Sequence, residues 1–358
     1  MIHTGPKLDF DDILIVPQFS DITSRNQVEV ITTIKGKWGA SITGVPIVAA
    51  NMDGVGTFSM NRALSKHGLF TAITKQKTVG DWRNEFLSLL NVSPVENPPE
   101  YMNTVDKLFI TIGMSEGELL KATQIVYFMK KYFGDVTPKI MIDVANGHMN
   151  PFYDYIAKVR ENIPDAFIMA GTVATGEATQ RILESGADLS RVGIGTGAVC
   201  TTRQVAGVGY PQASAILESY GVAYDENGGV VCDGGCSYPG DFSKAFGLGA
   251  KMVVAGSIFA GHDESEQDIH GGKVTFYGMS SHVAQKKHGE MKNYRASEGR
   301  IVQIPYKGAV EGTVQEILGG IRSACAYIGA NSISEMDEKA VFIQVNRQLN
   351  KSLERYTV

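Results

Sequence analysis

The sequence predicts a (β/α)8 barrel, and two observations carry this prediction. Eight short runs of apolar and β-branched residues recur along the chain, as is typical of strands buried on both faces of a parallel sheet. Amphipathic helix patterns lie between these runs, which is the alternation expected of βα units. A doubly wound open sheet is the alternative, but a count of eight strands with none left over favours a closed barrel.

The predicted strands are nearly continuous in apolar residues, and the helix patterns between them have recognisable ends. Ser115 is placed to cap a helix over 116–131, while Pro239-Gly240 precedes a helix over 241–246 that Gly247 and Gly249 end. Other helices are expected near Thr78 and over 152–162, 176–185 and 313–327. The strands are expected over 45–51, 69–74, 108–113, 139–145, 166–172, 189–195, 229–235 and 251–257.

A longer excursion, over about residues 262–308, follows the eighth strand. It contains Gly271-Gly272 and several lysines, which is typical of a surface hairpin or mobile flap. We therefore expect a single domain over residues 1–358 that carries this flap, and no second domain.

Charge and composition exclude several classes of function. The 33 Lys and Arg residues against 38 Asp and Glu give a net charge of −5, so no overall positive field attracts nucleic acid or an anionic membrane. No apolar run approaches about 18 residues, and residues 1–12 lack the apolar core of a signal peptide. We therefore expect a soluble, cytoplasmic protein. The four cysteines and scattered histidines form neither a disulfide framework nor a zinc pattern.

Polar residues and glycines gather where the predicted strands end. In a barrel these ends meet at one mouth, where the chemistry takes place. Each residue has an ordinary explanation, as a helix cap, a solvated side chain or a tight turn, but together they indicate a site. Glycines after the seventh and eighth strands fit a phosphate cradle of backbone N–H groups. The strand ends include Asn51-Met52-Asp53, Thr74-Lys75, Asp143, residues 193–200, Asp233-Gly234-Gly235 and Gly256-Ser257.

Cys200 lies in the segment GIGTGAVCTTR, residues 193–203. Free backbone N–H groups of this turn, and Arg203 nearby, would favour a thiolate nucleophile. The alternative is an unreactive core cysteine, which is the interpretation we give Cys232 and Cys325, with Cys236 left open. The hydroxyls of Thr201 and Thr202 could carry a proton if a carboxylate arrived from elsewhere.

Eight motifs resemble the IMP dehydrogenase/GMP reductase family, and the resemblance runs from about residue 8 to about residue 345. They are AANMD (49–53), DVANG (143–147), GIGTGAVCTTR (193–203), GVGYPQ (207–212), DGGC (233–236), FYGMSS (276–281), YRASEG (294–299) and LGGIR (318–322).

The resemblance implies a (β/α)8 barrel that assembles as a homotetramer. It is stronger to the reductase members, which convert GMP and NADPH to IMP, ammonia and NADP⁺ in purine nucleotide interconversion. By this resemblance Cys200 attacks C2 of the purine to give a covalent thioimidate. Thr202 and Glu298 would move the proton of the departing 2-amino group.

The resemblance also assigns ligand contacts. The nucleotide would be held by Asp233, Gly234, Gly235, Gly256, Ser257, Gly278, Met279, Ser280, Arg295, Ala296, Ser297, Glu298 and Gly299. NADPH would contact Lys75, Asp143, Val144, Ala145, Ser24, Arg25, Tyr294, Arg295 and Ser323. Main-chain carbonyls of Gly195, Gly197, Cys200 and Arg203 would bind a monovalent cation, usually potassium, which suits hard oxygen ligands.

Two residues depart from the family loop, which usually reads GPGSVC: Thr196 replaces proline, and Ala198 replaces a serine whose hydroxyl contacts phosphate. The alternative function is an IMP dehydrogenase without its regulatory insertion, which usually follows the second strand. Here the helix near Thr78 leaves no room for that insertion, and RASEG in the flap favours the reductase. A catalytically inactive barrel is disfavoured because Cys200, Thr202 and Glu298 are all present.

Overall fold

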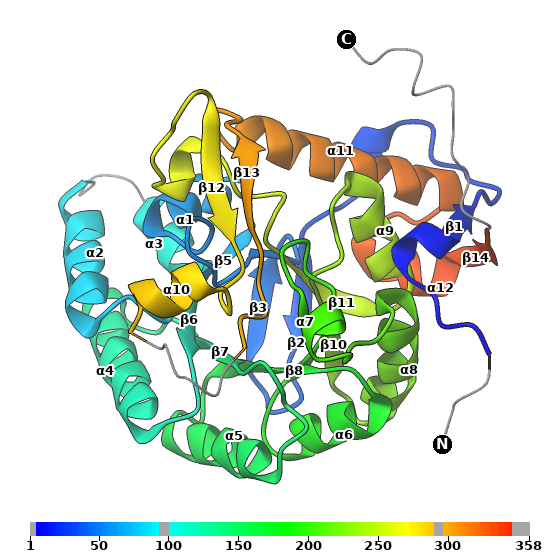
Figure 1. The fold of residues 1–358 in the computed structure, drawn as a ribbon. Helices are drawn as coiled ribbons and strands as arrows, with labels where there is room; N and C mark the ends of the chain where they lie inside the picture. Colours follow the sequence, from blue (N-terminus) through cyan, green and yellow to red (C-terminus); the bar gives the residue numbers. More distant parts are fainter. Residues whose placement is uncertain (1–4, 93–99, 290–295, 346–358) are drawn as a thin grey trace.

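A closed barrel of eight parallel strands forms the centre of the molecule (Figure 1). The computed structural model describes residues 5–92, 100–289 and 296–345. The barrel closes where β11 pairs with β4, through Val253 with Ile47 and Ala255 with Ala49. The predicted barrel is thus confirmed, and the open sheet is wrong. In barrel order the strands are β4 (Ile47–Ala49), β5 (Phe70–Ile73), β6 (Leu108–Ile112), β7 (Lys139–Asp143), β8 (Phe167–Val173), β9 (Leu189–Val192), β10 (Gly229–Asp233) and β11 (Ala250–Ala255).

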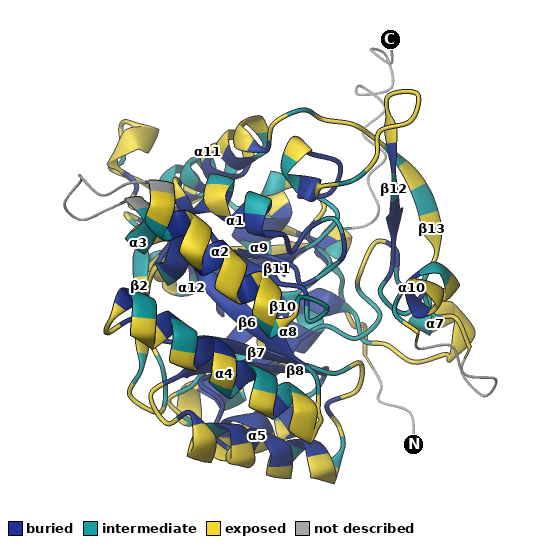
Figure 2. Ribbon diagram, turned by 90° about the vertical axis from the view of Figure 1, so that its left-hand side faces the viewer, coloured by how far each residue is buried: buried dark blue, intermediate teal, exposed yellow. Residues whose placement is uncertain are grey.

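The barrel strands are buried because helices cover their outer faces and side chains fill the interior. All seven residues of β8 and all five of β6 are buried, which explains why their sequences are continuously apolar instead of alternating. Figure 2 shows these strands in the buried colour, with exposed residues on the outer faces of α2, α4 and α5.

The helices that the sequence predicts begin and end close to their expected positions, while others, such as those over 58–65 and 212–225, were not predicted. The Ser115 hydroxyl accepts the Glu118 N–H at 3.3 Å and so caps α4. α2 begins directly after Thr78, so only a short loop separates it from β5. The helices are α1 (Phe58–Ser65), α2 (Val79–Val92), α3 (Glu100–Asp106), α4 (Glu116–Phe133), α5 (Asn150–Asn162), α6 (Gly176–Glu184), α7 (Thr202–Val205), α8 (Gln212–Asp225), α9 (Pro239–Gly247), α10 (His282–Lys287), α11 (Glu311–Ile328) and α12 (Met336–Lys339), with short 3-10 turns at Phe10–Asp12, Arg25–Gln27, Asp263–Ser265 and Ile333–Glu335.

Two strand pairs outside the barrel were not predicted. The hairpin of β2 (Thr32–Lys35) and β3 (Ser41–Gly44) covers the amino-terminal end of the barrel. Its Trp38 donates a main-chain N–H to Asp188 Oδ1 at 2.9 Å, just before β9. β1 (Ile13–Val16) pairs with β14 (Val341–Gln344) and joins segments from the two ends of the chain.

The excursion after β11 contains an antiparallel hairpin. β12 (Lys273–Tyr277) pairs with β13 (Ile301–Pro305), so that Tyr277 lies opposite Ile301. Figure 2 shows this hairpin and α10 on the side of the barrel opposite β2, next to the short α7. We call residues 262–308 the flap. One end of the barrel is therefore closed by β2 and β3, while the flap stands over the other end.

Candidate active site

A cavity of about 480 Å³ opens at the carboxyl ends of the barrel strands. Its size is in the range of small-molecule sites. The barrel loops and the flap both contribute to its lining. The lining residues include Asn51, Met52, Lys75, Met114, Asp143, Val144, Ala145, Thr172, Arg191, residues 193–200, Thr202, Asp233, Gly234, Gly235, Gly256, Ser257, Gly278, Met279, Ser280, His288 and Glu298.

Cys200, Thr202 and Glu298 form a continuous hydrogen-bond chain at this cavity. The Cys200 thiol donates to Thr202 Oγ1 over 3.2 Å, and the Thr202 hydroxyl donates to Glu298 Oε2 at 2.7 Å. In this series of hydrogen bonds each group donates to the next, and the last acceptor is the carboxylate of Glu298. A proton can therefore move from the thiol toward Glu298, which would leave a nucleophilic thiolate.

The main chain of the flap holds Glu298 in this position. Cys200 and Gly299 form an antiparallel bridge. The Thr201 N–H donates to Glu298 O at 3.2 Å, and the Arg300 N–H donates to Val199 O at 3.0 Å. The flap thus joins the cysteine loop as a short strand would, and small residues are needed where the backbones meet. A Cβ at Gly278 of the flap would lie only 3.0 Å from Val199 O of the cysteine loop.

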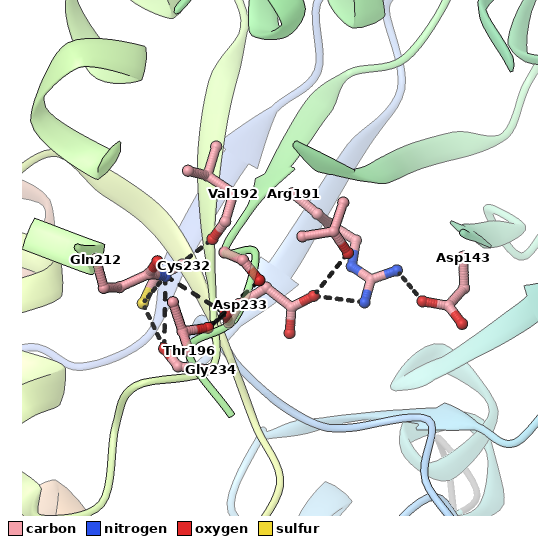
Figure 3. Close-up of polar contacts among 10 residues, drawn as sticks. Asp143, Arg191, Val192, Thr196, Gln212, Cys232, Asp233 and Gly234 are labelled. Atoms are coloured by element: carbon pink, nitrogen blue, oxygen red, sulfur yellow. Dashed lines mark hydrogen bonds and ion pairs between the residues drawn. The ribbon is translucent and has the colours of Figure 1, made fainter. Parts of the chain in front are cut away.

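A buried arginine joins two carboxylates on opposite sides of the cavity floor. Arg191, on β9, is 2% exposed, and its guanidinium bonds Asp143 Oδ1 at 2.8 Å and Asp233 Oδ2 at 2.6 Å (Figure 3). A buried charge is costly unless it is paired and hydrogen-bonded. The two carboxylates supply this pairing, and the arginine in turn fixes where both carboxylates point.

The two aspartates of this pair have different protonation properties. Burial favours the neutral form of Asp143, but the charges of Arg191 and Lys75 outweigh it and hold the pKa of Asp143 below its usual value. At Asp233 burial dominates, and the charge of Asp143 adds to it, so the pKa of Asp233 is raised despite the contact with Arg191. Asp143 therefore stays ionised beside Lys75, whereas Asp233 gains a proton more readily.

The glycine turn after β10 lines the cavity with its backbone, and the Gly234 N–H is held by Val254 O at 3.1 Å. Gly234 and Gly235 have φ of +80° and +85°, a conformation that glycine adopts without strain. Gly193 cannot be larger, because a Cβ there would lie 1.9 Å from Asp233 O. Gln212 supports this region from α8 by donating its side-chain amide to Val192 O at 2.9 Å.

A family model described as the IMP dehydrogenase / GMP reductase domain matches residues 7–352. The chain belongs to the IMP dehydrogenase/GMP reductase family. It is 48% identical to a GMP reductase of Caenorhabditis elegans, an alignment that covers 98% of this chain and 95% of that protein. It is 43% identical to GMP reductase 2 of Mus musculus, over 98% and 97% of the two chains, and 42% identical to a GMP reductase of Vibrio cholerae, over 96% of each.

The residue that departs from the family loop at position 196 now has a structural role. Thr196 Oγ1 donates to Asp233 O at 2.9 Å (Figure 3), so it ties the cysteine loop to the glycine turn after β10. Ala198 lines the cavity and has no hydroxyl. Since the Thr196 hydroxyl is directed to a carbonyl, it does not supply the phosphate donor that the family serine would provide.

The other three cysteines are buried, and Arg203 does not contact the Cys200 thiol. Cys232 and Cys325 are fully buried, and burial raises the pKa of Cys325 to about 12. Cys236, which the sequence left open, is 4% exposed, and burial raises the pKa of its thiol well above the usual value. The Arg203 guanidinium bonds Asp9 at 3.0 Å and Tyr210 O at 2.7 Å, so it is engaged with the N-terminal segment and not with the Cys200 thiol.

The structure separates the residues predicted from the family resemblance into three groups. Most of them line the cavity, including all those assigned on the barrel strands and at Gly278–Ser280. Ala296, Ser297 and Gly299 are close in sequence to the cavity-lining Glu298 but do not line the cavity themselves. The Ser297 hydroxyl instead accepts the His282 N–H at 3.0 Å. Ser24, Arg25, Arg203 and Ser323 are also outside the lining, and Tyr294 and Arg295 are outside the described residues.

Sequence reasoning missed Arg191 as a functional residue. The available signal was a single arginine inside an otherwise apolar strand pattern, LSRVGIG, since a charge in a fully buried strand needs a partner. Among the residues that the structure describes, no group of three His, Cys, Asp or Glu side chains is placed to hold a metal ion. None of the described helices is both long and apolar enough to cross a membrane.

Proposed function

We propose that this chain is a GMP reductase that converts GMP and NADPH to IMP, ammonia and NADP⁺. The observation that carries the proposal is the hydrogen-bond chain from Cys200 through Thr202 to Glu298 at the cavity. The similarity to proteins named GMP reductase over nearly the whole chain supports it.

In the first half of the reaction, Glu298 accepts the proton of the Cys200 thiol through Thr202. The thiolate attacks C2 of the purine, and a bond forms between Sγ and C2. C2 is a poor electrophile and an amine is a poor leaving group, so both a thiolate and acid assistance are required. Glu298 returns the proton through Thr202 to the 2-amino group, the C2–N bond breaks, and ammonia leaves. The product of this half is a thioimidate on Cys200.

When bound, NADPH supplies a hydride that reduces C2, after which the C2–Sγ bond breaks and IMP is released. The chain's own residues orient both reactants. The backbone N–H groups at Gly235, Gly256 and Ser257 suit the phosphate of the nucleotide, and Asp233 suits its ribose hydroxyls. Lys75 and Asp143 also line the cavity, and these two residues would hold the cofactor.

The test is an absorbance assay with purified protein. We expect loss of NADPH absorbance that depends on GMP, with release of ammonia and IMP. NADH formation from IMP and NAD⁺ would instead identify an IMP dehydrogenase. Folded protein that oxidises no NADPH in the presence of GMP would contradict the proposal.

We further propose that main-chain carbonyls of Gly195, Gly197, Cys200 and Arg203 bind potassium, and that the protein is a cytoplasmic homotetramer. The carbonyls belong to the loop before α7 and to α7 itself, so an ion there would rigidify the segment that carries Cys200. Replacing potassium by lithium in the assay should lower kcat. Light scattering of the purified protein measures its oligomeric state.

A further inference from the structure

A cluster of charged and polar side chains beside the cavity has no role in the function proposed above. Asp53, in the loop after β4, is at its centre, and its side chain is only 7% exposed. Its Oδ2 accepts the Tyr277 hydroxyl at 2.8 Å and the Lys287 ammonium at 3.0 Å, and lies 2.8 Å from His288 Nε2. These three partners all belong to the flap, at the end of β12 and the end of α10.

The carboxylate of Asp53 depends on this contact with the flap. Burial by itself would raise the pKa of Asp53, but the hydrogen bonds from Lys287, Tyr277 and His288 together hold it below its usual value. A buried carboxylate that loses its donors is strongly destabilised. Undocking of the flap would break all three contacts at once, and any partial loss of these donors that left Asp53 buried would be costly.

The same residue also contacts the part of the flap that lines the cavity. The main-chain N–H of Asp53 points to Met279 Sδ at 3.3 Å. Met279, Ser280 and His288 all line the cavity, and the Glu298 N–H donates to Ser280 O at 3.2 Å. A path of direct contacts thus leads from Asp53 through residues 279–280 to Glu298.

We propose that Asp53 is a positioning residue that docks the flap onto the barrel and thereby sets the place of Glu298 relative to Cys200. Beyond the contacts at its base, where the Thr57 hydroxyl donates to Glu264 O at 2.6 Å, the flap has two attachments near the cavity, one at the cysteine loop and one at Asp53. The first brings Glu298 to Thr202, and the second fixes α10 and residues 279–280 behind it. The consequence for turnover rests on the proposed function, whereas the docking itself does not.

Asp53→Asn tests the proposal, because it keeps the side-chain size and removes the charge. We expect kcat for GMP-dependent NADPH oxidation to fall by about tenfold to a hundredfold, since small displacements of reacting groups are costly. KM for GMP should change less than kcat, because the glycine turns that suit phosphate belong to the barrel, whereas only Gly278–Ser280 of the predicted nucleotide contacts lie beside Asp53 in the flap. Hydrogen exchange measured by mass spectrometry should become faster in residues 273–289 and 298–305 and stay unchanged in the barrel strands.

Variants on the flap side test the same contact without altering the barrel. His288→Gln and Lys287→Met each remove one partner of Asp53, and each should lower kcat and speed exchange in the flap by less than Asp53→Asn does. The effects of Asp53→Asn and His288→Gln should not add in the double variant. Asp263→Asn is the matched control: it removes a carboxylate that pairs with Tyr306 at the base of the flap, where its two ends meet, and it should behave as the parent protein does.

Folded Asp53→Asn protein with unchanged kcat and unchanged exchange in the flap would overturn the proposal. So would faster exchange spread evenly through the barrel, which would indicate a general stabilising role. If Asp53→Asn does not fold, the His288→Gln and Lys287→Met variants decide the question. If the parent protein shows no GMP-dependent NADPH oxidation, the proposed function fails, and the exchange measurements still decide whether Asp53 docks the flap.

Discussion

At the scale of single residues, the proposed chemistry depends on three side chains from two parts of the chain. Cys200 and Thr202 are two positions apart, while Glu298 is 96 positions beyond Thr202. Sequence alone left Cys200 open between a nucleophile and a core residue, because the partner that distinguishes them is remote. The family resemblance supplied the partner, and the structure brings it to 2.7 Å from the threonine hydroxyl.

Cys200→Ala should abolish turnover while GMP still binds. Without the sulfur no covalent bond to C2 can form, so kcat should fall by about a thousandfold or more. The glycine turns that suit phosphate are untouched, and calorimetry should give a Kd for GMP close to that of the parent protein. Turnover that persists in this variant would remove Cys200 from the mechanism.

Glu298→Gln should slow the release of ammonia more than it weakens GMP binding. The amide keeps the size of the side chain but cannot accept the thiol proton, and general acid–base assistance is worth about a hundredfold or more. Single-turnover measurement of ammonia release gives the rate directly. An unchanged rate would count against the proton path through Thr202.

At the scale of elements, the loop before α7 is bonded directly to the turn after β10. Thr196 ties them through Asp233 O, and the Arg300 side chain of the flap holds Ala198 O at 2.6 Å from Nη2. The loop is therefore fixed from two sides. What this loop lacks is a side-chain donor toward the cavity at position 198.

Ala198→Ser should strengthen the binding of GMP. The new hydroxyl would face the cavity beside the glycine turn, and a hydrogen bond to a charged phosphate is worth enough to lower KM for GMP by up to about tenfold. The matched comparison is Thr196→Ser, which keeps the hydroxyl bonded to Asp233 O and should leave KM unchanged. If KM for GMP does not fall in Ala198→Ser, the phosphate does not lie at this loop.

At the scale of the whole molecule, the repeating pattern of the barrel could be predicted, and its irregular parts could not. The eight barrel strands can be recognised in the sequence because each is largely apolar on both faces. The four-residue strands β1, β2, β3 and β14 carry no such signal, since they are short and partly exposed. The contacts of Arg191 and Asp53 were also missed, because each depends on residues brought together by closure of the barrel or docking of the flap.

The stability of the molecule should fall as the pH drops from about 7 toward about 5. Burial lowers the pKa of His262, which is 3% exposed near the start of the flap, and burial also lowers the pKa of His148. A histidine in the unfolded chain gains its proton near its ordinary pKa of about 6.5, whereas these two gain it only at lower pH when folded. The unfolded state therefore binds more protons in this window, and the free energy of unfolding decreases as pH falls.

Urea denaturation at several pH values across this window measures the effect. His262→Gln should reduce the dependence on pH, with the part due to His148 remaining. A free energy of unfolding that rises on acidification would contradict the assignment of a lowered pKa to His262.

The division of the active site between barrel and flap has a consequence for how its chemistry can change. In the proposed reaction the barrel holds the sulfur that bonds to the substrate, and the flap holds the carboxylate that accepts and returns the proton. Covalent capture and the fate of the captured intermediate are thus encoded in separate segments of the sequence. Exchanging residues 296–300 alone could redirect the intermediate to a different product while the barrel, its strands and its nucleophile stay as they are.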